Sequence, residues 1–227
     1  MYASSLATYA EVSRLVRAGA RCDLDQIVAV HKQAFPKTFG SALGKSYLRA
    51  FYAWFLADSA ALCLVAASQE QLLGYVVGCQ SSQTYYEQLY GTRQKTLVRA
   101  ALRGLLENPL ALIRLRRALP SVLPRLAQML GKWRPKLPQA SAATAPNFEV
   151  NCASLNVIAV HPSVLGSQVA TTLLHEFVRA ISQRGVTRIQ LTVDKNNSRA
   201  IRFYEREGWR RLAEIGTNFV YVTQVEG

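Results

Sequence analysis

Residues 155–177 read LNVIAVHPSVLGSQVATTLLHEF, and this stretch decides the fold. An apolar strand ends at His161 and Pro162, a short turn containing Gly166 follows, and an amphipathic helix then begins. The N–H groups at the start of a helix lack intrahelical partners and lie at the positive end of the helix dipole. The pattern therefore predicts a phosphate or pyrophosphate site, although an ordinary strand–turn–helix connection would look the same.

A second stretch, residues 193–209, reads VDKNNSRAIRFYEREGW and resembles a signature of the GNAT N-acetyltransferase superfamily. The resemblance rests on the order and spacing of Asn197, Ala200, Ile201, Phe203, Tyr204, Gly208 and Trp209. The strand before Pro162 and the helix after it agree with the same family. The resemblance covers about residues 13–80 and 150–225.

The resemblance implies an α/β GNAT fold, with a mixed central sheet of about seven strands, splayed central strands and helices on both faces. Apolar patterning places strands at residues 13–18, 61–67, 72–79, 150–160, 188–193, 209–215 and 218–225. It places helices at residues 24–34, 44–57, 93–107, 167–183 and 198–207, the first capped by Asp23. We expect one domain over residues 1–227, with a basic helical insertion at about 82–147 between the third and fourth strands.

The resemblance also implies that acetyl-coenzyme A (acetyl-CoA) is the co-substrate and that no metal is needed. The pantetheine arm would lie along the fourth strand, and the pyrophosphate would bind N–H groups of residues 165–170. The cofactor-binding residues implied are Val157, Ile158, Ala159, Val160, Leu165, Gly166, Ser167, Gln168, Val169, Ala170, Asn197, Ala200 and Tyr204. Two positions depart from the family's phosphate loop, since Leu165 replaces Gln or Arg and Gln168 replaces a glycine. Gln168 fits if its backbone is already helical, and otherwise it would crowd the pyrophosphate or reach over it.

Direct attack of an amine on a thioester needs positioning, an oxyanion site and an acid for the departing thiolate. The resemblance assigns the acid role to Tyr204, whose ordinary pKa of about 10 is compatible with protonating a thiolate. The general base stays open between Glu149 and a water held by Asn151 or Ser154, and Glu149 could equally be a surface charge at the strand edge. The fold would place His31, Phe35 and Tyr221 on the acceptor side of the cleft.

The predicted function is transfer of an acetyl group from acetyl-CoA to a primary amine, and the expected acceptor is the amine of a small molecule such as an amino sugar. The stretch FPKTFGSALGKSYLRAFY, residues 35–52, weakly resembles bacterial GNAT proteins of surface-polysaccharide synthesis. A protein N-terminus or a lysine is an alternative acceptor. A further alternative is a GNAT-fold binding module that has lost catalysis and docks on an anionic membrane or a partner.

The net charge of +13 is concentrated in one segment. Residues 93–136 contain eleven Lys or Arg and one acid, Glu107. Three hypotheses compete for this segment: a helical cap with solvated arginines, a contact with an anionic membrane surface, and attraction of an acidic substrate such as a nucleotide-linked sugar. Nucleic acid is disfavoured because Trp133 is the only aromatic residue in the segment.

The remaining composition indicates an ordinary globular enzyme, with 50% hydrophobic residues in 227. The four cysteines, Cys22, Cys63, Cys79 and Cys152, form no CxxC pair, which favours a reducing cytoplasm over a disulfide framework. Neither a signal peptide nor a spanning segment is visible. We therefore expect a cytoplasmic protein, at most peripheral to the inner membrane surface, and leave homodimer formation open.

Overall fold

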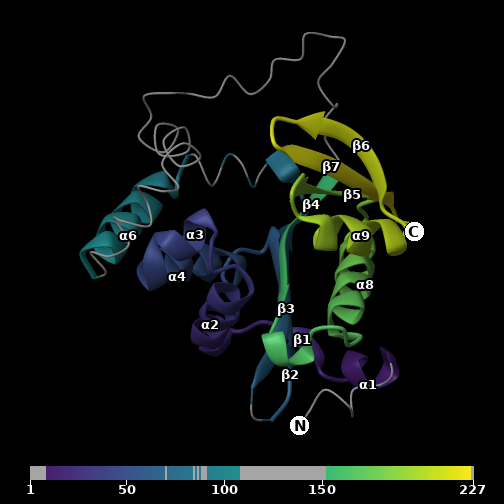
Figure 1. The fold of residues 1–227 in the computed structure, drawn as a ribbon, viewed down its shortest axis with the longest axis horizontal. Helices are drawn as coiled ribbons and strands as arrows, with labels where there is room; N and C mark the ends of the chain where they lie inside the picture. The colour runs from purple at the N-terminus through teal and green to yellow at the C-terminus, as the bar shows by residue number, and fades with distance from the viewer. Residues whose placement is uncertain are drawn as a thin grey trace.

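A seven-stranded mixed sheet forms the centre of the protein (Figure 1). The computed structural model describes residues 9–69, 71–83, 85, 87, 91–107 and 152–225. The strands are β1 (Val16–Ala18), β2 (Ala61–Ala67), β3 (Leu72–Cys79), β4 (Cys152–Val160), β5 (Arg188–Asp194), β6 (Arg210–Ile215) and β7 (Asn218–Gln224). Their order in the sheet is β1-β2-β3-β4-β5-β7-β6. The mixed sheet expected from the sequence is thus confirmed.

The parallel pair β4 and β5 separates partway along its length. The two strands pair only from Cys152 with Arg188 to Ser154 with Gln190, although β4 continues to Val160 and β5 to Asp194. Every other neighbouring pair in the sheet is antiparallel. The divergence confirms the splayed central strands and leaves the backbone of two adjacent strands open to a ligand.

Helices cover both faces of the sheet (Figure 1). On one face lie α2 (Leu24–Ala34), α3 (Phe39–Ala42), α4 (Gly44–Phe55) and α6 (Gln94–Glu107). On the other lie α1 (Tyr9–Ser13), α8 (Val169–Ser182) and α9 (Ser198–Arg206). Each face therefore has its own core, as a sheet buried on both sides requires.

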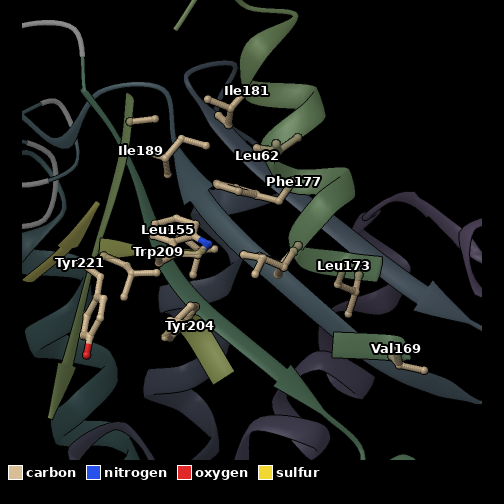
Figure 2. Packing of buried hydrophobic residues seen from close by; sticks show 14 of the residues in the cluster. Leu62, Leu155, Val169, Leu173, Phe177, Ile181, Ile189, Tyr204, Trp209 and Tyr221 are labelled. Carbon is tan, nitrogen blue, oxygen red and sulfur yellow. The ribbon is translucent and has the colours of Figure 1, made fainter. Parts of the chain in front are cut away.

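The two cores differ in composition. The core under α2 and α4 is aromatic and includes Tyr52 and Phe55 from α4 and Tyr75 from β3. The core under α8 is mainly aliphatic around Phe177, which is fully buried, and α8 contributes residues at helical spacing (Figure 2). These α8 residues are Val169, Leu173, Leu174, Phe177 and Ile181.

Strand β3 is buried on both faces along its whole length, which fits its apolar sequence LLGYVVGC. Gly78 lies where this strand meets β4 and α8 most closely. A Cβ on Gly78 would lie 2.2 Å from the carbonyl oxygen of Ser154 and 2.4 Å from Cζ of Phe177. Glycine is therefore the residue that allows α8 to pack this tightly on the sheet.

The sequence placed seven strands and five helices close to their observed bounds, with differences at the N-terminal end. The expected strand 13–18 begins only at Val16, because Ser13 still belongs to α1. Asp23 does not cap α2 through its side chain. Its carboxylate instead accepts two hydrogen bonds from the Arg17 guanidinium, at 2.7 and 2.8 Å, and one from the backbone N–H of Ala20 at 2.8 Å.

The described part of the basic insertion is mainly helix α6, which packs against α4. Leu97, Ala101 and Gly104 form its buried face, whereas the side chains of Leu102 and Leu106 are exposed. A helical cap describes this part of the insertion. The rest of the segment, including Trp133, lies outside the described residues, and so do Glu149 and Asn151.

None of the helices in the described ranges has the length and apolarity needed to cross a membrane.

Candidate functional site

A cleft of about 730 Å³ opens where β4 and β5 diverge. Residues 155–160 of β4 and 191–194 of β5 form its walls, and α8 and α9 contribute residues at one end. The end of α2 and the turn after it line the opposite end. The cleft thus lies in the gap that the sheet topology creates.

Most of the site residues expected from the sequence line this cleft. They are His31, Phe35, Val157, Ile158, Ala159, Val160, Leu165, Gly166, Ser167, Ala170, Asn197, Ala200 and Tyr204. Gln168, Val169 and Tyr221 are not among its lining residues. Glu149 lies outside the described part of the chain.

The turn before α8 explains how this chain departs from the usual phosphate loop. Gly166 has φ +85, a left-handed conformation that favours glycine, and open space surrounds its α-carbon. Gln168 has φ −73 and ψ −4, so its backbone is helical and needs no glycine. The turn therefore places its left-handed glycine two positions before Gln168, and Gln168 itself needs no glycine conformation.

The first turn of α8 offers backbone N–H groups to the cleft. The N–H of Val169 contacts the Ser167 hydroxyl at 3.4 Å, and this hydroxyl donates to the carbonyl of Val164 at 2.6 Å. Ala170 and Thr171 follow in the same turn and line the cleft. Unpaired N–H groups at a helix start suit a phosphate, so these residues fit a diphosphate group.

Three arginines on α9 also line the cleft, and the sequence analysis missed them. Arg199, Arg202 and Arg206 are three and four residues apart, which places them on one side of the helix. All three are exposed. The helical spacing within residues 193–209 was the available signal, and the cluster adds positive charge suited to phosphates.

Asn197 caps the helix that carries these arginines. Its side-chain oxygen accepts a hydrogen bond from the N–H of Ala200 at 3.1 Å. Capping occupies the amide oxygen, so the amide NH₂ is the group that remains for a cofactor.

Tyr204 combines a buried ring with a position at the cleft. Its side chain is 5% exposed and packs in the α8 core, with its ring centroid 5.7 Å from that of Trp209 (Figure 2). Within the described chain, no side chain or backbone group forms a hydrogen bond with its hydroxyl. Burial raises the pKa of Tyr204 above its usual value, so the hydroxyl stays protonated at neutral and mildly alkaline pH.

Tyr221 lies elsewhere. Its ring is fully buried in the α8 core, and its hydroxyl donates to Oε1 of Glu205 at 2.8 Å. Burial raises the pKa of Tyr221 above its usual value, and the hydrogen bond to Glu205 raises it further. The geometry therefore does not bring Tyr221 to the acceptor end of the cleft.

His31 and Phe35 lie together at the α2 end of the cleft, with ring centroids 5.2 Å apart. His31 is 8% exposed, and burial lowers its pKa to about 4. The ring is therefore neutral at physiological pH. Its Nδ1 lies 2.6 Å from the hydroxyl of Tyr52 and 3.1 Å from that of Tyr75.

Candidates for the general base are few among the residues described. Besides His31, Tyr204 and the arginines, the titratable group lining the cleft is Asp194, which is exposed and accepts from the N–H of Asn196 at 2.8 Å. Ser154 is buried and donates to Oδ1 of Asn156 at 3.2 Å. Asn156 itself lines the cleft at a bulge, where Val157 and Leu155 pair with consecutive residues of β3.

The described residues also contain no group of His, Cys, Asp and Glu side chains arranged to hold a metal ion.

Comparison with known proteins agrees with this geometry. Residues 134–209 match the model of the acetyltransferase (GNAT) family. A search of curated proteins found no match.

Solved structures share the fold at low sequence identity. The PaiA N-acetyltransferase of Thermoplasma acidophilum, solved with coenzyme A, is 14% identical with a TM-score of 0.54. The match covers 92% of this chain and 97% of the PaiA chain. An aminoglycoside 6'-acetyltransferase type Ii is 12% identical with a TM-score of 0.55, covering 94% and 98%. The ribosomal-protein-S18-alanine N-acetyltransferase of Escherichia coli is 11% identical with a TM-score of 0.54, covering 93% and 94%. Residues 134–209 thus match the model of GNAT acetyltransferases, and the chain around them shares its fold with solved acetyltransferase structures.

Proposed function

We propose that this chain is an N-acetyltransferase that moves an acetyl group from acetyl-CoA directly to a primary amine. The observation that carries the proposal is the cleft between β4 and β5, which joins a phosphate-binding turn to a buried tyrosine and a separate polar end. A cofactor with a diphosphate and a long arm fits such an arrangement, and an acceptor fits the far end.

The residues fit coenzyme A in charge and in shape. Gly166 and the start of α8 offer open space and N–H groups for a diphosphate, and the arginines of α9 add positive charge. The unpaired edges of β4 and β5 offer backbone groups to the pantetheine amides. A neighbour of similar fold was solved with coenzyme A, which agrees with this assignment.

Acetyl-CoA supplies a thioester whose carbonyl carbon is open to attack by a neutral amine. The cleft positions the two reactants, so that a carbon–nitrogen bond forms as the carbon–sulfur bond breaks. The electron pair of the broken bond leaves on sulfur, and the Tyr204 hydroxyl donates a proton to it. The amine loses its proton to water, because Asp194, the carboxylate among the described lining residues of the cleft, is itself exposed to solvent.

The acceptor end favours a small, hydroxyl-bearing amine such as an amino sugar. Gln33, Thr38 and Asn156 are uncharged hydrogen-bonding residues there, and His31 is neutral. Hydroxyl groups pair readily with such a lining. A protein N-terminus or a lysine is the second candidate, because one neighbour of similar fold is named for an aminoglycoside and another for an alanine of a ribosomal protein.

The experiment is a thiol-release assay with acetyl-CoA and a panel of amines. The panel contains amino sugars, an aminoglycoside, and peptides that offer either a free N-terminus or a lysine. Binding of acetyl-CoA is measured in parallel by calorimetry. Release with amino sugars supports the proposal, and release only with peptides transfers it to the second candidate. Binding without release for any amine would instead indicate a GNAT-fold module that has lost catalysis.

A further inference from the structure

A closed triangle of polar groups lies behind the acceptor end of the cleft. It consists of Nδ1 of His31 and the hydroxyls of Tyr52 and Tyr75, with the two hydroxyl oxygens 2.7 Å apart. The two tyrosines are fully buried. Among the residues that the structure describes, neither hydroxyl has a hydrogen-bond partner outside the triangle.

Counting the protons of this triangle determines the tautomer of His31. Each hydroxyl carries one proton, and a buried donor needs an acceptor. If Nδ1 has no proton, Tyr52 donates to Nδ1 at 2.6 Å and Tyr75 donates to the oxygen of Tyr52 at 2.7 Å, so both protons are paired. If Nδ1 carries a proton, one hydroxyl can still donate to the other, but the second hydroxyl has no acceptor. The neutral ring therefore carries its proton on Nε2.

The surroundings of Nε2 agree with this assignment. Oγ1 of Thr38 lies 3.5 Å from Nε2, and the Thr38 hydroxyl donates to the carbonyl of Phe35 at 3.0 Å. The Thr38 oxygen is thus available as an acceptor for an N–H on Nε2. A separation of 3.5 Å is long for a hydrogen bond, so this N–H is only weakly engaged and can bind a better acceptor.

The position of this N–H indicates what it would bind. His31 and Thr38 both line the cleft, and their neighbours there, Gln33, Ala34 and Phe35, are uncharged. A neutral N–H donor attracts an oxygen with a free lone pair, and it does not attract an ammonium group.

We propose that His31 recognises the acceptor substrate by donating the Nε2 hydrogen to one of its carbonyl, carboxylate or hydroxyl oxygens. His31 is then a specificity-determining residue and not the general base, because Nε2 has no lone pair to accept a proton. The inference rests on the proposed function only in calling the bound molecule an acceptor, since the donor itself follows from the triangle.

The tautomer can be measured without any substrate. The protein is labelled with ¹⁵N-histidine, and long-range ¹H–¹⁵N spectra distinguish a protonated ring nitrogen from an unprotonated one. The chain has three histidines, so the signals of His31 are assigned as those missing from His31→Gln. We expect a protonated Nε2 and an unprotonated Nδ1 at neutral pH. A protonated Nδ1 in the folded protein would overturn the inference.

Small probes then test the chemistry of the ligand. Sodium acetate and acetamide are titrated into the labelled protein, with methylammonium chloride at equal ionic strength as the control. We expect the Nε2 signal of His31 to move in a dose-dependent manner with the two oxygen probes and to stay in place with methylammonium. Equal movement with methylammonium, or none with either oxygen probe, would contradict the proposal.

Once an acceptor is known, two substitutions separate recognition from structure. His31→Asn keeps an acceptor near the tyrosines but has no atom near Nε2, whereas His31→Gln keeps an N–H donor near Nε2. We expect His31→Asn to raise the KM of the acceptor about tenfold and His31→Gln to raise it less, with the KM of acetyl-CoA unchanged in both. A larger effect on acetyl-CoA would overturn the assignment. If no amine is acetylated but the spectra agree, the proposed function fails and the donor assignment stands.

Discussion

Replacing Tyr204 by Phe tests the leaving-group acid directly. The substitution removes one hydroxyl and keeps the ring, which packs 5.7 Å from Trp209 between centroids. The hydroxyl has no hydrogen-bond partner in the described chain, so its loss breaks no internal hydrogen bond. We therefore expect the stability of Tyr204→Phe to lie within about 1 kcal/mol of the wild type.

The effect on turnover follows from the environment of the hydroxyl. A positioned general acid contributes about 10²- to 10⁴-fold to a rate. Burial raises the pKa of Tyr204 further above that of a thiol, about 8.5, and so makes it a weaker acid. We therefore expect the lower end of the range, a fall in kcat of about 10²-fold, which is about 2.7 kcal/mol of transition-state stabilisation.

The assay is thiol release with the best amine from the panel, combined with calorimetry for acetyl-CoA. Tyr221→Phe is the matched control, because its ring is equally buried and its hydroxyl donates to Glu205 outside the cleft lining. The control loses a hydrogen bond to a carboxylate, so it should lose about 1.5–3 kcal/mol of stability while kcat stays unchanged.

Two results would refute the reasoning. If Tyr204→Phe weakens acetyl-CoA binding as much as it slows turnover, the hydroxyl binds the cofactor and does not act as the acid. If Tyr221→Phe slows turnover, the sequence-based placement of Tyr221 at the acceptor side is supported over the placement seen here.

Three further predictions concern the turn, the buried histidine and the core. Gly166→Ala should weaken acetyl-CoA binding, measured by calorimetry, and should cost about 1–2 kcal/mol of stability because the φ of Gly166 is +85. The control is Gly185→Ala, at a glycine with φ +76 that does not line the cleft. It should cost similar stability and leave acetyl-CoA binding unchanged. An unfolded histidine gains its proton near pH 6.5, whereas His31 in the folded protein gains it only near pH 4, so protonation favours the unfolded chain between these values. As pH falls from 6.5 to 4, the free energy of unfolding of the wild type should therefore decrease by up to about 3 kcal/mol more than that of His31→Gln. Denaturant unfolding at the two pH values measures this, and an equal loss in both proteins would contradict it. Phe177→Ala should cost about 3–5 kcal/mol in the same assay, since the ring is fully buried, and a loss below 1 kcal/mol would show that the α8 core is misplaced.

Local sequence patterns determined most of the elements and predicted most of the residues that line the cleft. Helix α2 occupies the range that apolar spacing predicted, residues 24–34. The turn at Gly166 and the helix start after it depend on neighbouring residues alone, so both could be predicted from the sequence. Whether Gln168 could stand in place of a glycine depended on its backbone conformation, which is helical in the structure.

Other features required strand pairing and register, which a single sequence does not contain. Tyr221 lies within a run of buried residues in β7, and such a run shows no alternation from which its face could be read. The bulge at Asn156 depends on the register between β3 and β4. The arginines of α9 differ, because their helical spacing was visible in the sequence and was overlooked.

The stretches 155–177 and 193–209 by themselves predicted the fold, and they indicated coenzyme A as co-substrate and Tyr204 as the candidate acid, because strand, turn and helix signals act over a few neighbouring residues. Only the tertiary structure decided the role open to His31. Its partners Tyr52 and Tyr75 lie 21 and 44 residues away in the sequence. Tyr52 comes from helix α4 and Tyr75 from strand β3, and both side chains pack in the same core. The tautomer of His31 is fixed only once packing has excluded water and brought the three polar groups together.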